Sequence, residues 1–185
     1  MLAIGSSNRD GRHRGLVSPQ TIERKPGVSP SQTWNDVRIE KERVAVSITM
    51  VGGESLSGSL FAPQIYPPGG LEDPLRLLNE AEPFFPFGLA TGEVLLISKA
   101  RVLEIELEGS SGTEELPGSA PTALLQLTLA GGVTHVGSVR LEVRASRPRV
   151  LDYMNHCVEP FMALRTDEGV RLINRKMIER VRPLD

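Results

Sequence analysis

Three histidines and one cysteine are the side chains of this sequence best suited to acid–base, nucleophilic or metal chemistry: His13, His135, His156 and Cys157. The spacings H-x-E, H-E-x-x-H and C-x-x-C do not occur, so the sequence predicts no zinc site. Adjacent residues of a helix point about 100° apart, which places His156 and Cys157 poorly for sharing a proton. We therefore expect this pair to have a packing role rather than a catalytic one.

Serine, glycine and arginine patterns do not define a cofactor site either. The G-x-S-x-G motif is absent, and no glycine pair precedes a helix with Lys-Ser or Lys-Thr, so the sequence predicts no nucleophile elbow and no P-loop. Arg140 and Arg144 have the R-x-x-x-R spacing of the PilZ family, but they lie in mid-domain instead of a leading arm. We expect no cofactor.

Two carboxylates occupy matching positions, Glu82 before Pro83 and Glu159 before Pro160. As a pair they could perform general acid–base catalysis in a site between two domains. The simpler interpretation is that each glutamate marks the entrance to a strand, and we expect a protein that is not an enzyme.

The matching glutamates belong to a longer internal similarity. Three blocks recur in the same order: VSITMVGGESLSGSL with LQLTLAGGVTHVGSV, LRLLNEAEPFFPF with LDYMNHCVEPFMAL, and EVLLISKARVLEIEL with GVRLINRKMIERVRPL. The first block begins at Val46 and its partner at Leu125. We interpret residues 43–107 and 122–185 as two copies of one unit.

Each unit shows the pattern of a small β domain. Alternating apolar residues on either side of Gly52-Gly53 and Gly131-Gly132 predict hairpins, because tight turns need the positive φ that glycine permits. Helical spacing predicts short helices near 73–81 and 149–157. Three further strands follow, so the fold class is mainly β, with two tandem five-stranded barrel-like units (ββ, short helix, βββ) after an extended arm.

This pattern resembles Sm-like and SH3-like small β-barrels, and the doubled arrangement is similar to bacterial proteins of uncharacterised function that are built of paired small β domains. The resemblance implies a fold and transfers no functional residue. Four phenylalanines are expected to fill the two cores or the joint between them, with stacking on a ligand as the alternative: Phe84, Phe85, Phe87 and Phe161.

The two copies are flanked by polar segments. Residues 1–42 are rich in Ser, Pro, Arg, Gln and Gly and predict an extended arm, and residues 108–121 have the composition of a linker. Trp34 is the single tryptophan of the chain. It is interpreted either as an anchor for a partner protein or as a side chain that folds back onto its own barrel.

Composition limits the function classes. The net charge is −2, which argues against general binding to nucleic acid or anionic lipid, and one cysteine gives no internal disulfide. The first residues lack the apolar run of a signal peptide, and no segment reaches the roughly 20 apolar residues that span a bilayer. We expect a cytoplasmic protein.

The net charge hides a difference between the copies. Residues 43–121 hold four basic and eleven acidic side chains, for a net charge of −7, whereas residues 122–185 hold ten and seven, for +3. Glu104 and Glu106 share one face of a predicted strand. The basic positions of the second copy are Arg140, Arg144, Arg147 and Arg149. These acidic and basic side chains form either solvated outer faces or surfaces that contact each other, across the two copies or between molecules.

The favoured function is a non-enzymatic adaptor or assembly protein that contacts other protein subunits, with homo-oligomers formed through the opposite-charge faces. The expected contact residues are Trp34, Arg140, Arg144, Arg147, Arg149, Glu104 and Glu106. The alternative is a regulator that binds nucleic acid or a nucleotide through the arginine-rich second copy, against which stands an aromatic content of 4%.

Overall fold

A computed structural model describes residues 41–63, 72–110, 120–141 and 149–184. Every described residue belongs to one compact unit, residues 37–185. We call the described residues of 41–110 the first half and those of 120–184 the second half. The predicted arm (1–42) falls outside the described residues except for the backbone of its last two, and most of the predicted linker (108–121) falls outside as well.

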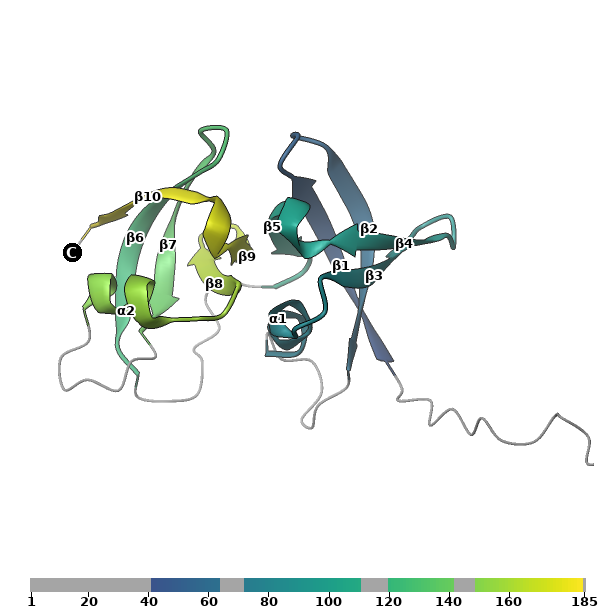
Figure 1. Ribbon diagram of the computed structural model, residues 1–185, viewed down its shortest axis with the longest axis horizontal. Coiled ribbons are helices and arrows are strands. Elements are labelled where there is room, and N and C mark those ends of the chain that lie inside the picture. The colour runs from purple at the N-terminus through teal and green to yellow at the C-terminus, as the bar shows by residue number, and fades with distance from the viewer. Residues whose placement is uncertain (1–40, 64–71, 111–119, 142–148, 185) are drawn as a thin grey trace, which may run out of the picture. The chain divides into compact units, whose positions relative to one another are not determined.

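Both halves have the same order of elements (Figure 1). The first half consists of β1 (Lys41–Met50), β2 (Ser55–Pro63), α1 (Glu72–Asn79), β3 (Phe84–Leu89), β4 (Val94–Ser98), a 3-10 turn η1 (Lys99–Arg101) and β5 (Val102–Leu107). The second half consists of β6 (Thr122–Leu129), β7 (Thr134–Arg140), α2 (Val150–His156), β8 (Phe161–Thr166), β9 (Gly169–Asn174), a 3-10 turn η2 (Arg175–Met177) and β10 (Ile178–Pro183).

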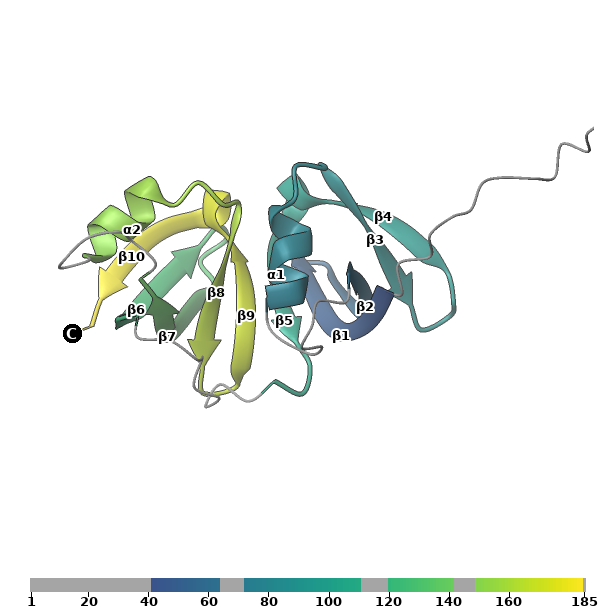
Figure 2. The same ribbon diagram turned by 90° about the horizontal axis from the view of Figure 1, so that it is seen from below.

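The predicted β class is confirmed, and the two short helices lie within two residues of their expected positions. All ten strands form one antiparallel sheet in the order β10-β6-β7-β8-β9-β5-β1-β2-β3-β4. The first half therefore has the order fifth, first, second, third, fourth strand, and so does the second. Within each half the strands curl instead of lying flat (Figure 2).

Two glycines explain how the second and third strands cross in each half. A Cβ on Gly58 would lie 2.3 Å from the Gly88 carbonyl oxygen, and one on Gly137 would lie 2.3 Å from the Arg165 carbonyl oxygen. Real Cβ contacts are never so short, so only glycine lets the backbones approach at these points. The two positions correspond in the sequence alignment, so both halves meet the same packing requirement in the same way.

A cation caps the last turn of each helix, where backbone carbonyls lack intrahelical partners. In the first half the Lys99 ammonium donates to the carbonyls of Leu77 (2.9 Å) and Glu80 (2.8 Å). In the second half the Arg175 guanidinium donates to the carbonyls of Tyr153 (3.4 Å) and Met154 (2.7 Å). Lys99 and Arg175 each follow the fourth strand, at aligned positions.

Buried apolar residues form two clusters. The first is built mainly from the first half, around Ile48, Leu60, Leu78, Phe85, Phe87 and Ile105. The second is built mainly from the second half, around Leu125, Leu127, Tyr153, Met162 and Leu164. Burial of this apolar surface is the main stabilising contribution to the fold. Among the described residues, no helix is long and apolar enough to cross a membrane.

Candidate interaction surfaces

The two halves join through main-chain hydrogen bonds between β5 and β9. The strands run antiparallel, with Ile105 opposite Leu172 and Glu106 opposite Arg171. This pairing turns two five-stranded sheets into one of ten strands. We call this contact the internal junction.

Apolar side chains cross the internal junction in both directions. Phe161, Val170 and Leu172 come from the second half, yet they pack in the first cluster and are only 1%, 3% and 0% exposed. Leu103 makes the reverse crossing, from β5 into the second cluster. Each core is therefore completed by residues of the other half.

Asn79, at the end of α1, fixes the start of β8. Its Oδ1 accepts a hydrogen bond from the Phe161 amide (2.8 Å), and its Nδ2 donates to the Phe161 carbonyl oxygen (3.2 Å). Asn174 makes a second tie, because its buried Nδ2 donates to the carbonyls of Lys99 (3.1 Å) and Val102 (2.8 Å). These polar contacts set the register in which the apolar side chains meet.

An ion-pair network lies on the same junction. Arg171 on β9 contacts Glu104 (3.4 Å) and Glu106 (3.1 Å) of β5 and Glu168 (2.9 Å) of its own hairpin. His135 on β7 places Nε2 2.6 Å from the second Glu104 oxygen. The Glu104 side chain is 7% exposed and that of Arg171 is 12% exposed. Buried groups of this kind need their partners, since an unpaired buried charge is costly.

Only some of the predicted contact residues lie at the internal junction. Glu104 and Glu106 meet Arg171 and His135 across the two halves, although the sequence reasoning had singled out neither of these two as a contact residue. Arg140 ends β7 and is half-buried, and Arg149 is exposed just before α2. Trp34, Arg144 and Arg147 lie outside the described residues.

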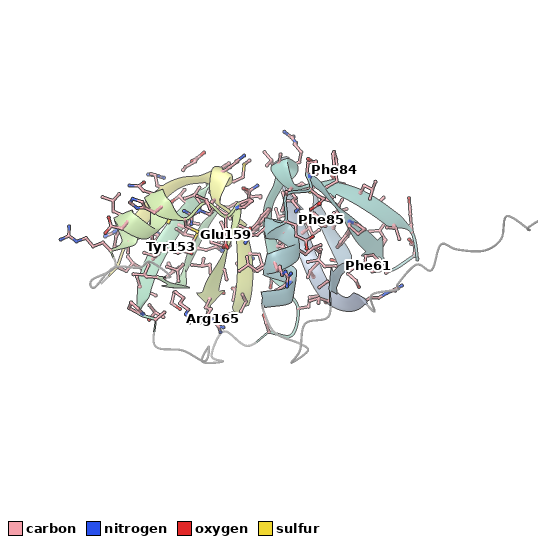
Figure 3. The ribbon with its side chains drawn as sticks, turned by 60° about the horizontal axis from the view of Figure 1, so that its bottom comes forward. Phe61, Phe84, Phe85, Tyr153, Glu159 and Arg165 are labelled. Atoms are coloured by element: carbon pink, nitrogen blue, oxygen red, sulfur yellow. The ribbon has the colours of Figure 1, made fainter. Side chains whose placement is uncertain are left out.

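Among the described strands, β4 forms one free edge of the sheet, and this edge is apolar. Phe84 on β3 and Val94 on β4 are each 54% exposed, and Leu96 on β4 is 72% exposed. The expectation that Phe84 fills a core or the joint is wrong, because along β3 it points to the side opposite the buried Phe85 (Figure 3). Exposed apolar side chains in a row on an edge strand mark an interaction surface.

The other free edge, β10, is basic. Arg180 and Arg182 are exposed there, beside the half-buried Val181. These three residues, with Gln126, Thr128 and Thr134, line a groove of about 550 Å³ on the second half. The chain thus offers an apolar edge at β4 and a basic edge at β10.

The structure also places residues that the sequence singled out for possible chemistry. His156 Nδ1 lies 2.8 Å from the Asp152 carbonyl oxygen, at the end of α2. Glu82 is exposed, and Glu159 is exposed and lies 3.4 Å from Asn79 Nδ2. Among the described residues no group of three or more His, Cys, Asp and Glu is placed to hold a metal ion.

Burial changes the pKa of Lys99. Its side chain is buried, and this desolvation lowers the pKa of the ammonium below its ordinary value, while the charges of Glu80 and Glu82 act in the opposite direction. The two hydrogen bonds to the end of α1 explain its position, which is that of a helix cap.

Comparison with known proteins identifies no relatives, since no family model, no curated protein and no solved structure matches the chain. Function is therefore inferred from the contacts and surfaces of this chain alone.

Proposed function

We propose that this protein is a non-enzymatic assembly protein that binds other protein subunits through the free edges of its sheet. The observation that carries the proposal is the apolar β4 edge, where Phe84, Val94 and Leu96 are all at least 54% exposed. Edge strands of monomeric proteins are usually protected by charge, proline or a covering segment. Val94 and Leu96 give this edge none of that protection.

We further propose that the chain is a tandem duplication of one small curled β unit, residues 43–107 and 122–185. The common strand order, the aligned Gly58 and Gly137, and the aligned caps Lys99 and Arg175 support it. A fused pair of such units offers two different edges to partners, which suits a protein that links subunits.

The proposal also gives residues 1–42 a role in binding a partner. Trp34 is expected to anchor this segment to a partner, because tryptophan gives large buried contact areas at protein interfaces. Limited proteolysis with and without a captured partner tests this. A segment that is cut equally fast in both states speaks against it.

The test of the main proposal compares three tagged baits in the native cell: wild type, Leu96→Arg at the β4 edge, and Val136→Arg as the control. Val136 is 49% exposed but lies on β7, which has strands on both sides. We expect co-purifying protein in near-stoichiometric amount with wild type and control, and its loss with Leu96→Arg. Baits that purify alone, or that retain the same proteins with all three sequences, refute the proposal.

A second candidate is nucleotide or nucleic-acid binding, and the groove beside β10 is the observation that favours it. Arg180 and Arg182 supply two positive charges next to the polar Gln126, Thr128 and Thr134. A salt-dependent gel shift that Arg180→Glu with Arg182→Glu abolishes is the expected result for this class. The absence of a gel shift at low salt would exclude this second function.

A further inference from the structure

We propose that the partner at the β4 edge is a second copy of this protein, whose β10 edge pairs with β4 in the register that β9 and β5 use at the internal junction. This inference rests on the proposed function and names its partner. Each molecule then offers one edge of each kind, so copies add head to tail.

The internal junction supplies the template. In each half, β4 and β9 are the fourth strands, and β5 and β10 are the fifth. At the internal junction a fourth strand, β9, pairs with a fifth strand, β5. The remaining fourth strand, β4, and the remaining fifth strand, β10, are the two ends of the sheet. Transferring the register of Ile105 with Leu172 places Val181 of one molecule opposite Leu96 of the next.

The exposed apolar side chains of β3 and β4 are the counterparts of those that cross the internal junction. The pairing of β3 with β4 sets Phe84 opposite Ser98, and the pairing of β8 with β9 sets Phe161 opposite the aligned Asn174. Phe84 therefore corresponds to Phe161, and Val94 and Leu96 correspond to Val170 and Leu172. Exposure falls from 54%, 54% and 72% in the first set to 1%, 3% and 0% in the second. The same positions are thus buried wherever a fifth strand covers them.

The helices show the same contrast in burial, because α1 lies at the internal junction and α2 lies in the half that offers β10. Leu78 on α1 is fully buried, whereas its counterpart Met154 on α2 is only partly buried. Asn79 holds the main chain of Phe161, whereas its counterpart Asn155 is exposed. Leu151, at the position of Leu75, is 68% exposed. A neighbour's β3 and β4 would bury these residues, and Asn155 would then reach the backbone of Phe84.

Charge favours this partner over an unrelated apolar one. The fifth-strand positions that hold Glu104 and Glu106 in the first half hold Arg180 and Arg182 in the second. In the transferred register Arg182 lies opposite Leu95, and Glu93 is its diagonal neighbour on the same face, within reach of a long side chain. Residues 43–121, which include β4, carry a net charge of −7, whereas residues 122–185, which include β10, carry +3. Complementary charge fixes register and orientation.

One residue departs from the template. Both fifth strands have a register irregularity, at Val102–Glu104 in one and at Ile178–Arg180 in the other. The residue between is Leu103 in β5, which is buried in the opposite core, and Glu179 in β10, which is exposed. A glutamate in place of that leucine weakens the contact between molecules relative to the internal junction. It makes the association reversible.

A contact between different edges does not stop at two copies. Such an interface is heterologous, so it closes into a ring or continues as a filament. Pairing of β4 with β4 would instead give a closed dimer. The stoichiometry and the identity of the paired strands therefore separate the two arrangements.

Cross-linking tests the pairing directly in full-length protein that carries Cys157→Ser. Leu96→Cys and Val181→Cys are prepared separately, then mixed and oxidised, because directly opposed strand residues lie within disulfide reach. We expect a disulfide-linked dimer in the mixture, at several times the yield from either variant alone. Val136→Cys replaces Leu96→Cys as the control and is expected to give none. Equal yields from Leu96→Cys alone refute the proposal in favour of β4 with β4.

Sedimentation over a range of concentrations tests the assembly itself. Wild-type protein is expected to exceed the mass of a dimer as concentration rises. Leu96→Arg is expected to raise the apparent dissociation constant at least about tenfold, because it places an unpaired arginine opposite Val181 in an apolar contact. Val136→Arg is expected to leave it unchanged. Glu179→Leu, which restores the counterpart of Leu103, is expected to lower the constant. Thermal unfolding at low concentration verifies that each variant folds.

The outcomes distinguish this inference from the proposed function. Self-assembly is overturned if the protein stays monomeric and gives no mixed cross-link. If Leu96→Arg nevertheless loses a co-purifying protein, the proposed assembly function stands, and the β4 edge binds another protein or residues 1–40. Weaker association of Glu179→Leu also overturns the inference. A monomer that captures nothing overturns both.

Discussion

The Asn79 side chain bonds both main-chain polar groups of Phe161, accepting from its amide at 2.8 Å and donating to its carbonyl at 3.2 Å. The two residues are 82 positions apart and belong to different halves of the chain. One amide side chain thus docks the first helix onto the first strand after the second helix, and it sets where the second half inserts Phe161 into the first core.

Replacing Asn79 by alanine should therefore loosen the internal junction. We expect Asn79→Ala to lower the free energy of unfolding by about 1 to 3 kcal/mol, because two main-chain groups lose their partner. The measurement is chemical denaturation at a concentration low enough to keep the protein monomeric. Asn155→Ala, at the aligned and exposed position, is the control and should change stability by less than about 0.5 kcal/mol. Equal effects would show that the contact contributes nothing to the junction.

Arg171 and Glu104 should be energetically coupled. Removing the guanidinium in Arg171→Met leaves the buried Glu104 carboxylate without its arginine partner, and we expect a loss of about 3 kcal/mol. Glu104→Gln in the same chain should recover part of that loss, because the uncompensated charge is gone. A double-mutant cycle measures the coupling. Additive effects of the two substitutions contradict a shared network.

The pH dependence of stability should carry the signature of Lys99. Its folded-state pKa is lowered from 10.5 by burial, so between the folded value and 10.5 the unfolded chain binds more protons than the folded one. Stability due to this group therefore rises with pH across that window. Lys99→Arg is the reference, since guanidinium does not titrate there and Arg175 shows that arginine fits such a cap.

The quantity to measure is the unfolding free energy of wild type minus that of Lys99→Arg, from neutral pH upward. We expect this difference to increase toward pH 10.5, and taking the difference cancels the titration of other groups. A difference that stays constant or falls as the pH rises contradicts the assignment of a lowered pKa.

Gly58 should be intolerant of any side chain. The new methyl group of Gly58→Ala would meet the Gly88 carbonyl oxygen at 2.3 Å and the Phe87 ring at 2.7 Å, and a backbone atom cannot move away cheaply. We expect a loss of about 1 to 3 kcal/mol, typical of overpacking. Gly52→Ala is the matched control, since nothing lies within 4 Å of its Cβ position. Thermal unfolding of both variants decides, and equal melting temperatures would refute the close approach.

Much of the fold follows from local sequence. The alternating apolar residues around Gly52-Gly53 and Gly131-Gly132 predict the two hairpins, and positive φ at Gly53 and Gly132 agrees with the expected turns. The helices begin and end near their predicted positions because apolar periodicity and turn residues act over a few neighbours. The recurrence of three blocks also indicates that the strands of one half are repeated in the other, in the same order.

The pairing of strands between the two halves was determined by the tertiary structure. Pairing of β5 with β9 depends on which edges come together, and main-chain hydrogen bonds leave no pattern in the side chains that would reveal it. The sequence left Glu104 either on an outer face or at a contact between the copies, and the folded chain buries it against Arg171. Phe84, expected in a core or at the joint, is exposed, while the aligned Phe161 is buried. Sequence alone predicted the order of strands and helix in each half, because hydrophobic period and turn chemistry are local. Only the tertiary structure determined which strand edges are covered, because the burial of an edge depends on the strand that pairs with it.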